Sequence, residues 1–446
     1  MNVPRLMISA TSSGSGKTLI TCGILQALTN RGLKVSSFKC GPDYIDPMFH
    51  SKVIGTVSRN VDAFFSDNDT MKRLFGEVAK DSDISVIEGV RGFYDGSNVE
   101  DSCASSCDVS LRLGAPAILL INSRGAARST LAMLKGFIDF EENNIKGVIF
   151  NRMSKNTFQK LKDQVSQMGV VPLGYVPKVD VNLDSRHLGL VLPDEISDLR
   201  ERLNALAGIL EETVDIDGLI EIARDSQEIL YDDHTPENRT DIRIGLARDD
   251  AFCFIYEDNI SMLRKMGADV IEFSPLNDPE RPDVDMIILP GGYPELHGDM
   301  LEKNASMRES IKSRIENGMP CLAECGGFMY LHDTMEDGDG IVRNMCGVIT
   351  GTTHNTGSLK RFGYITLNKD GISIKGHEFH YWDSDSCGED WIACRKSGQT
   401  YNCIHDDGRL VAGYPHLYYP SSPEFVRMVI ERAEQYRREM SRTSSE

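Results

Sequence analysis

The fold of this chain is decided by residues 6–18, which read LMISATSSGSGKT. The run Leu6–Ala10 is apolar and strand-like, the residues after it are small, and helical periodicity follows over Leu19–Leu28. A strand, a glycine-rich turn and a helix in this order predict a phosphate-binding P-loop. The residues that we expect to contact the phosphates are Ser13, Gly14, Ser15, Gly16, Lys17 and Thr18.

The chemistry of this loop depends mainly on its last residues. Backbone N–H groups of the turn can point inward around phosphate oxygens, Lys17 can reach the β- and γ-phosphates of ATP, and the Thr18 hydroxyl can bind Mg²⁺. The position where the pattern usually has its first glycine holds Thr11. A glycine- and serine-rich turn at an ordinary helix N-terminus is the alternative, but the complete order of strand, loop and helix favours nucleotide binding.

Acidic residues follow apolar runs at three places in the N-terminal half. In a doubly wound sheet, ligands collect at the carboxyl ends of the strands, so these carboxylates are candidates for a metal and nucleotide site. They are Asp43 and Asp46 in KCGPDYIDP (residues 39–47), Glu88 after ISVI (residues 84–87) and Asp95 in RGFYDG (residues 91–96). We expect Thr18, Asp43 and Glu88 to hold Mg²⁺, and Asp43, Asp46 and Asp95 to line the ATP site. One such residue alone would indicate a solvated loop charge, whereas three acidic loops indicate a site.

Short apolar runs alternate with helical patterns along the chain. The strand candidates of the first half are Leu6–Ala10, Val35–Cys40, Ile84–Val90, Ala117–Asn122, Gly147–Arg152 and Val170–Val176. A second series consists of Ile242–Ala247, Val270–Phe273, Met286–Pro290 and Cys321–Ala323. This alternation is typical of βαβ units around parallel strands that are buried on both faces. We predict an α/β fold with two domains, each with a mostly parallel sheet flanked by helices.

The domain boundaries follow from length and composition. A chain of 446 residues is too long for one hydrophobic core. The stretch around residues 225–241 is polar, contains a proline and lacks periodicity, as linkers do. We therefore expect a first domain, which carries the phosphate loop, at residues 1–225, a linker at 226–241 and a second domain at 242–446. Helical spacing of apolar residues predicts a packed helix over Glu424–Met440 at the end.

The second half contains the pattern of a nucleophile elbow. Residues 320–331 (PCLAECGGFMYL) predict a strand, then Cys325 on a tight turn with two glycines, then a helix whose N-terminus lowers the pKa of the thiol. A thiolate there can attack the side-chain amide of glutamine and form a thioester. The developing oxyanion would be held by backbone N–H groups of Gly326 and of Gly292, which lies in MIILPGGYPE (residues 286–295). The alternative for Cys325 is a buried structural thiol.

A general base is expected near the C-terminus. His416, in GYPHLYYP (residues 413–420), follows the elbow in the chain and is the candidate that activates Cys325 and protonates the departing ammonia. Many such glutaminases carry an acid two residues after the histidine, but Tyr418 stands there. We therefore predict a Cys325–His416 dyad. A second histidine cluster, GHEFHY at residues 376–381, lacks further ligands for a metal, and we expect it to have a structural or substrate-facing role.

The bulk properties exclude several classes of function. A net charge of −19 repels nucleic-acid phosphates and anionic membranes. The sequence shows neither a membrane-spanning segment nor a signal peptide, and its eleven cysteines have no regular framework. We expect reduced thiols in a cytoplasmic protein whose partners are small molecules, with a homodimer as a further possibility.

With these residues in hand, the chain resembles the cobyrinate a,c-diamide synthase family over essentially its whole length. The shared stretches are residues 10–18, 39–47, 88–89, 94–96, 291–295, 323–327 and 376–381, of which KCGPDYIDP is the most specific. The resemblance implies a domain like dethiobiotin synthetase followed by a class I glutamine amidotransferase. It also implies that ATP phosphorylates acetate carboxylates of a corrin-type tetrapyrrole, and that ammonia released from L-glutamine at Cys325 displaces the phosphate, first on the c and then on the a side chain.

Two other functions stay open from the sequence. A related enzyme, Ni-sirohydrochlorin a,c-diamide synthase, uses the same motifs on a nickel macrocycle. A P-loop switch or partitioning ATPase with an inert second domain is an alternative of another class. Such ATPases usually carry a second lysine early in the loop, and this chain has Ala10, Thr11 and Ser12 there, which favours the amide synthase.

Overall fold

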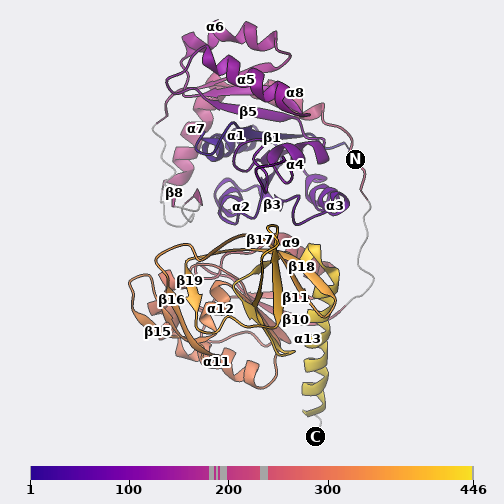
Figure 1. Cartoon of the computed structure of the whole chain (residues 1–446), viewed down its shortest axis with the longest axis vertical. Helices are drawn as coiled ribbons and strands as arrows, with labels where there is room; N and C mark the ends of the chain where they lie inside the picture. The colour runs from indigo at the N-terminus through magenta and orange to yellow at the C-terminus, as the bar shows by residue number, and fades with distance from the viewer. Residues whose placement is uncertain (1, 180–184, 187–188, 191–197, 232–239, 444–446) are drawn as a thin grey trace. The chain divides into compact units, whose positions relative to one another are not determined.

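A computed structural model of the chain describes residues 2–179, 185–186, 189–190, 198–231 and 240–443. The chain divides into two compact units, Met1–Asp233 and His234–Glu446, which are shown in indigo to pink and in pink to yellow in Figure 1. Each unit has its own sheet and its own hydrophobic core. The predicted α/β fold class is confirmed for both units.

The described residues of the first unit form a seven-stranded parallel sheet with the order β3-β2-β4-β1-β5-β6-β7. Most of these strands are buried along their whole length, as expected for a sheet covered on both faces. The strands are β1 (Arg5–Ala10), β2 (Val35–Cys40), β3 (Val57–Val61), β4 (Ile84–Glu88), β5 (Ala117–Asn122), β6 (Ile145–Asn151) and β7 (Val171–Val176). The predicted strands match within one or two residues, but β3 was missed because its sequence, VSRNV, is mostly polar.

Helices flank this sheet. They are α1 (Lys17–Asn30), α2 (Ile45–Phe49), the π-helix η1 (His50–Ile54), α3 (Asn68–Ala79), α4 (Ser106–Arg112), α5 (Ser129–Phe140), α6 (Lys155–Ser166), α7 (Leu199–Thr213) and α8 (Ile216–Arg224). Several begin at a side-chain N-cap, which satisfies a free backbone N–H of the first turn. These caps are Asp67, Ser105, Ser154 and Asp215. A short antiparallel pair, β8 (Ser185–Arg186) and β9 (Gly189–Leu190), completes the described part of the unit.

Residues 226–231, at the start of the predicted linker, pack on the first unit. Arg5 donates hydrogen bonds to Ser226 Oγ at 3.2 Å and to the carbonyl of Gln227, and Ile229 is buried in the core. The predicted linker residues 232–239 lie outside the described residues.

The second unit contains a six-stranded sheet in its described part, with the order β11-β10-β12-β13-β23-β22. All neighbours are parallel except β22, which is antiparallel to β23. The strands are β10 (Arg243–Ala247), β11 (Asp269–Phe273), β12 (Met286–Leu289), β13 (Cys321–Glu324), β22 (His405–Asp406) and β23 (Leu410–Gly413). The helices are α9 (Glu257–Lys265), the 3₁₀ turn η3 (Pro294–Leu296), α10 (Gly298–Lys303), α11 (Ala305–Glu316), α12 (Gly326–Tyr330), the 3₁₀ turn η4 (Tyr419–Ser421) and α13 (Pro423–Thr443).

Two further sheets in this unit were not predicted. The order β21-β20-β17-β18-β24 is antiparallel throughout, and β15-β14-β16-β19 is mixed. Their strands are β14 (His332–Glu336), β15 (Val342–Asn344), β16 (Ile349–Asn355), β17 (Arg361–Lys369), β18 (Ile372–His380), β19 (Trp382–Ser384), β20 (Trp391–Arg395), β21 (Thr400–Cys403) and β24 (His416–Leu417). Half-exposed strands such as β17 alternate polar and apolar residues, so they lack the apolar runs on which the sequence analysis relied.

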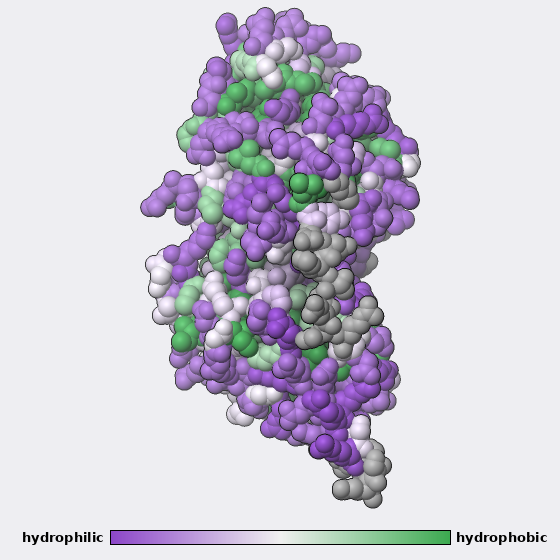
Figure 2. Space-filling model, turned by 90° about the vertical axis from the view of Figure 1, so that its right-hand side faces the viewer, coloured by the Kyte–Doolittle hydropathy of each residue, from purple (hydrophilic) through white to green (hydrophobic). Residues whose placement is uncertain are grey.

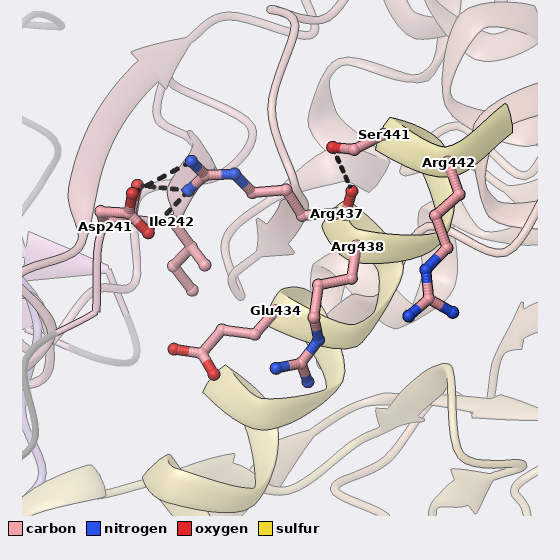
Figure 3. A pocket seen from close by; sticks show the side chains of 7 residues that line it. All are labelled: Asp241, Ile242, Glu434, Arg437, Arg438, Ser441 and Arg442. Atoms are coloured by element: carbon pink, nitrogen blue, oxygen red, sulfur yellow. Dashed lines mark hydrogen bonds and ion pairs between the residues drawn. The ribbon is translucent and has the colours of Figure 1, made fainter. Parts of the chain in front are cut away.

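The predicted C-terminal helix is present as α13, three residues longer than expected at its end. It packs against the start of β10, where Arg437 donates to Asp241 Oδ1 at 2.8 Å and to Oδ2 at 3.0 Å (Figure 3). An open pocket beside this contact is lined by Asp241, Ile242, Glu434, Arg437, Arg438, Ser441 and Arg442. It contains none of the predicted site residues, and Arg437 is already paired.

Hydrophilic residues predominate on the face shown in Figure 2. Among the described residues, no helix has both the length and the apolar character that crossing a bilayer requires.

Candidate active sites

The predicted phosphate loop joins β1 to α1 and has the conformation that its glycines allow. Gly14 and Gly16 have φ values of 76° and 88°, which residues with a Cβ rarely adopt. Gly16 is the N-cap of α1. Asn151, at the carboxyl end of β6, donates to the carbonyl of Ser15 at 2.8 Å. A Cβ at position 16 would lie 2.5 Å from Asn151 Nδ2. Asn151 was not predicted as a site residue, although its place after the apolar part of β6 was a signal.

Lys17 and Thr18, at the start of α1, form hydrogen bonds with residues that lie at and just after the end of β4. Lys17 Nζ donates to the carbonyl of Arg91 at 2.7 Å, and burial, with the nearby charge of Lys39, lowers the pKa of Lys17 to about 8. The Thr18 hydroxyl donates to Glu88 Oε1 at 2.7 Å. The structure therefore brings together Thr18 and Glu88, which the sequence predicted as partners in a metal site.

A buried lysine completes this cluster. Lys39 and Glu88 are register partners on β2 and β4, and Lys39 Nζ donates to Glu88 Oε1 at 2.8 Å. Lys39 also forms an ion pair with Asp46, and His50 Nε2 lies 3.5 Å from Glu88 Oε2. Sequence analysis assigned no role to Lys39 or His50. A lysine at the end of a buried strand was the available signal for the first, whereas no local pattern marked the second.

The charges in this cluster shift one another's pKa values. Burial lowers the pKa of Lys39, but the carboxylates of Asp46 and Glu88 raise it above its ordinary value. Burial raises the pKa of Glu88, but Lys39 and His50 hold it below its usual range. Burial and the charge of Asp43 raise the pKa of Asp46 to about 8. The buried ammonium group of Lys39 therefore faces two carboxyl groups, those of Glu88 and Asp46.

The other two predicted carboxylates lie at the rim of this site. Asp43 Oδ1 accepts hydrogen bonds from the N–H groups of Ile45 and Asp46, at 2.9 and 3.1 Å, so it caps the turn that carries Asp46. Asp95 is exposed, and its Oδ2 accepts from the Gly92 N–H at 2.9 Å. A Cβ at Gly92 would lie 3.1 Å from the carbonyl of Thr11, which places this loop beside the phosphate loop.

The residues fit a magnesium ion shared with a nucleotide. Magnesium prefers oxygen ligands and usually takes only one or two carboxylates, with phosphate and water supplying the rest. Glu88 Oε2 and Asp46 Oδ1 are buried oxygens that have no hydrogen-bond partner among the described residues. The described residues include no group of three histidine, cysteine or acidic side chains arranged to hold a metal by themselves.

Cys325 follows β13 on a strained turn. Its φ of 45° and ψ of −103° are unusual for a residue with a side chain, and such strain costs about 1–3 kcal/mol. Close packing makes the two following glycines necessary. A Cβ at Gly326 would lie 2.8 Å from Pro294 Cδ, and one at Gly327 would lie 2.0 Å from the carbonyl of Leu289. This geometry is that of the predicted nucleophile elbow.

The space left by the missing side chain of Gly291 borders both Cys325 and His416. A Cβ at position 291 would lie 2.3 Å from His416 Cε1 and 3.4 Å from Cys325 Cβ. The cysteine is 6% exposed and the histidine 2%. The two predicted members of the dyad, which are 91 positions apart in the chain, therefore lie on either side of one glycine in a nearly closed site.

The predicted oxyanion glycines lie next to each other. A Cβ at Gly326 would be 3.0 Å from the backbone nitrogen of Gly292. The N–H of Cys325 donates to the carbonyl of Gly413 at 2.8 Å, so it is already used within the sheet. Gly292 itself tolerates no side chain, because a Cβ there would lie 2.0 Å from the carbonyl of Ala251.

The electrostatics of the dyad correct one expectation. Burial and the charge of Glu295 raise the pKa of Cys325 well above its ordinary value and outweigh the N–H of Gly326 at the start of α12, which lowers the pKa of the thiol as expected. The helix α12 is only five residues long, so its dipole is small. Burial also lowers the pKa of His416 well below its ordinary value. The resting dyad is therefore an uncharged thiol beside an uncharged imidazole.

This uncharged state predicts how Cys325 reacts with iodoacetamide in the absence of glutamine. Because only the thiolate reacts, we expect alkylation of Cys325 to accelerate roughly tenfold per pH unit from pH 7 to 9 without a plateau. Mass spectrometry of the Cys325 peptide measures this rate, with the exposed Cys103 as an internal reference. A plateau reached below pH 8 would show a thiolate–imidazolium pair and contradict the prediction.

Gly291→Ala should damage the dyad selectively. The new methyl group would push His416 away from Cys325, and a displacement of about 1 Å can lower catalysis about 100-fold. We expect such a loss in glutamate release, with ammonia-dependent synthesis unchanged. Gly338→Ala is the matched control, because its Cβ would meet only ordinary contacts at 3.5 Å. Equal glutaminase activity of the two variants would disprove the placement of His416.

Comparisons with known proteins agree with this geometry. A family model described as CobQ/CobB/MinD/ParA nucleotide binding domain matches residues 6–191, and a CobB/CobQ-like glutamine amidotransferase domain matches residues 243–423. A cobyrinate a,c-diamide synthase from Listeria monocytogenes is 41% identical over 437 residues, which cover 93% of this chain and 96% of that protein. Proteins of the same name from Salmonella typhimurium and Priestia megaterium are 36% and 35% identical, covering 94% and 98% of this chain and 96% and 99% of theirs. With both sites in one polypeptide, this chain belongs to the cobyrinate a,c-diamide synthase family.

Proposed function

We propose that this chain is an ATP- and glutamine-dependent ligase that converts the a- and c-acetate carboxylates of cobyrinate into carboxamides during cobalamin biosynthesis. The observation that carries the proposal is the presence of two different sites in one chain. One is a phosphate loop whose Thr18 meets Glu88, and the other is a cysteine on an elbow beside a histidine. The names of the relatives supply the macrocycle.

The first step activates a carboxylate. An acetate oxygen of the macrocycle attacks the γ-phosphorus of ATP, ADP leaves, and an acyl phosphate forms. We assign phosphate contacts to residues 13–17 and the orientation of the γ-phosphate to Lys17. Thr18, Asp43 and Glu88 would hold Mg²⁺, which neutralises phosphate charge when bound. Asp46 and Asp95 complete the proposed nucleotide site.

Lys39 has a specific part in this proposal. It now neutralises Glu88 and contacts Asp46, both of which a metal would approach. If Glu88 held Mg²⁺, the ammonium group of Lys39 would be free to pair with a second anion in the site. A substrate carboxylate or the transferred phosphoryl group would supply that anion.

The second step releases ammonia. The Cys325 sulfur attacks the side-chain amide carbon of glutamine while His416 accepts the thiol proton, and the backbone N–H groups of Gly292 and Gly326 stabilise the oxyanion. His416 then protonates the departing ammonia, which leaves a thioester. Water hydrolyses the thioester to glutamate and regenerates the thiol. In this proposal the dyad is uncharged at rest, and the proton moves from Cys325 to His416 as the sulfur attacks bound glutamine.

The third step joins the two half-reactions. Ammonia attacks the acyl carbon and inorganic phosphate leaves, which yields the carboxamide. A free carboxylate could not react in this way, because oxide is a poor leaving group. Free ammonia is mostly protonated at neutral pH, so its release inside a sheltered site preserves the nucleophile. We propose residues 1–225 for the synthase part and 242–446 for the glutaminase part, in the reducing cytoplasm that Cys325 requires.

Purified protein tests this proposal directly. It is incubated with ATP, Mg²⁺, glutamine and either cobyrinate or Ni-sirohydrochlorin, and the macrocycle is followed by mass spectrometry. We expect two carboxylates of cobyrinate to become carboxamides, with one ATP and one glutamine consumed for each. Amidation of the nickel macrocycle alone would move the assignment to that substrate. ATP hydrolysis without any amide would instead support a switch ATPase.

A further inference from the structure

The imidazole ring of His416 lies between two groups of the same unit. The backbone of Gly291 approaches its Cε1 edge, as described above. On its face, the ring of His377 stacks with centroids 4.9 Å apart and an interplanar angle of 16°. His377 and His416 are register partners of the antiparallel strands β18 and β24. The preceding Gly376 allows this approach, because a Cβ there would lie 2.4 Å from the carbonyl of His416.

His377 is itself held by a chain of buried contacts. Its Nδ1 lies 3.2 Å from the Tyr256 hydroxyl. The rings of Tyr256 and Tyr418 meet edge to face with centroids 5.4 Å apart, and the Tyr418 hydroxyl donates to Asp258 Oδ2 at 3.0 Å. A continuous set of packed side chains therefore runs from Asp258 on α9 to the general base.

The segment of the chain that carries His416 is fixed in the same way. Asn259 donates to the carbonyl of Leu417 at 2.9 Å and accepts from the N–H of Tyr419 at 2.8 Å. With β24 anchored on both sides, the remaining freedom of His416 is rotation of its ring. His377 stacks against the face of that ring and restricts this rotation, while the Phe254 ring lies with its centroid 6.1 Å away at 54°.

We propose that His377 is a positioning residue for His416 and does by ring stacking what an acid does by hydrogen bonding in a complete triad. This inference rests on the proposed glutaminase function. In a Ser-His-Asp triad the acid fixes the orientation of the imidazole. Here the place of the acid is taken by Tyr418, whose hydroxyl bonds to Asp258. Stacking fixes the ring plane, and the Tyr256 contact fixes the plane of His377 in turn.

The state of His377 suits this role. Burial lowers the pKa of His377 to about 3, so the ring is uncharged when His416 takes the thiol proton. A protonated His377 at this distance would repel the imidazolium and oppose proton transfer. The stacked neighbour therefore orients the base without competing for its proton.

Two substitutions separate stacking from hydrogen bonding. His377→Phe keeps a flat ring against His416 but loses the contact with Tyr256, and His377→Gln keeps a hydrogen-bonding group but loses the ring. We expect kcat for glutamine hydrolysis to fall about 10- to 100-fold in His377→Gln. In His377→Phe it should stay within about threefold of wild type. In both variants KM for glutamine should change less than about threefold, because His377 acts on the base and not on substrate binding.

Control variants distinguish the positioning role of His377 from the proposed glutaminase activity itself. His354→Ala removes a half-exposed histidine of β16 in the same unit and should leave glutaminase activity unchanged. Thermal unfolding of each variant checks that the unit is folded. Wild-type kcat in both His377 variants, or an active Gln variant with an inactive Phe variant, would overturn the stacking role. Equal loss in both variants would also overturn it. Absence of glutaminase activity in the wild-type protein would instead reject the proposed function.

Discussion

Replacing Cys325 by serine is expected to abolish glutamine-dependent amide formation and to leave ammonia-dependent formation intact. A serine hydroxyl beside an uncharged imidazole is a far weaker nucleophile than a cysteine thiol. Loss of a covalent nucleophile lowers turnover by at least about a thousandfold. The phosphate loop belongs to the other unit, so carboxylate activation should continue.

The experiment compares glutamine with ammonium chloride as the nitrogen donor, at a pH where free ammonia is present. Cys394→Ser is the matched control, because this half-buried cysteine of β20 accepts only a weak hydrogen bond from Asn368 and lies outside the dyad. We expect the control to use both donors at wild-type rates. Retention of glutamine use by Cys325→Ser would remove the basis for the whole second site.

Lys39→Met is expected to produce the largest loss of stability in the first unit. Lys39 is the buried ammonium group that faces both Glu88 and Asp46. Removing one partner of a buried ion pair leaves an uncompensated charge and typically costs about 3–5 kcal/mol. Methionine is unbranched and only one atom shorter than lysine, so most of this cost reflects lost charge compensation and little of it lost packing. ATP-dependent synthesis should disappear as well, with either nitrogen donor.

Denaturant unfolding of wild type and variant measures this loss. Lys135→Met is the control, because the Lys135–Asp139 pair is 2.5 Å apart on the exposed surface of α5, and such pairs contribute only about 0–1 kcal/mol. The glutaminase activity of the Lys39 variant should remain, since Cys325 and His416 lie in the other unit. A Lys39 variant as stable as the Lys135 variant would mean that Glu88 and Asp46 do not depend on Lys39.

Predictions from the sequence succeeded where a single segment carries all the information. The phosphate loop and the cysteine elbow are continuous stretches whose small residues fit only one backbone path, and the structure shows both. Parallel strands such as β1 and β4 were found because burial on both faces requires an unbroken apolar run. The strands β17 and β18 were not found, because strands with one solvated face keep polar residues at alternate positions.

Contacts between distant segments could not be predicted from the sequence, because no local pattern identifies the partner. Nothing near Lys39 indicates that its ammonium group meets Glu88, because the partner lies on a neighbouring strand 49 positions later. His50 and Asn151 likewise have roles only because the sheet order places their segments beside the phosphate loop. Burial, which the sequence does not show, outweighs the expected lowering of the Cys325 pKa by the helix N-terminus, which is present through the N–H of Gly326.

The sequence by itself determined the two kinds of chemistry, because a phosphate loop and a cysteine elbow are local backbone geometries that specific glycines, a lysine and a thiol make possible. Only the tertiary structure decided which side chains complete each site. Strand register brings Lys39 to Glu88 and His377 to His416, and the missing Cβ at Gly291 leaves room for His416 near Cys325. Such proximity depends on how whole strands pair, which no short stretch of sequence encodes.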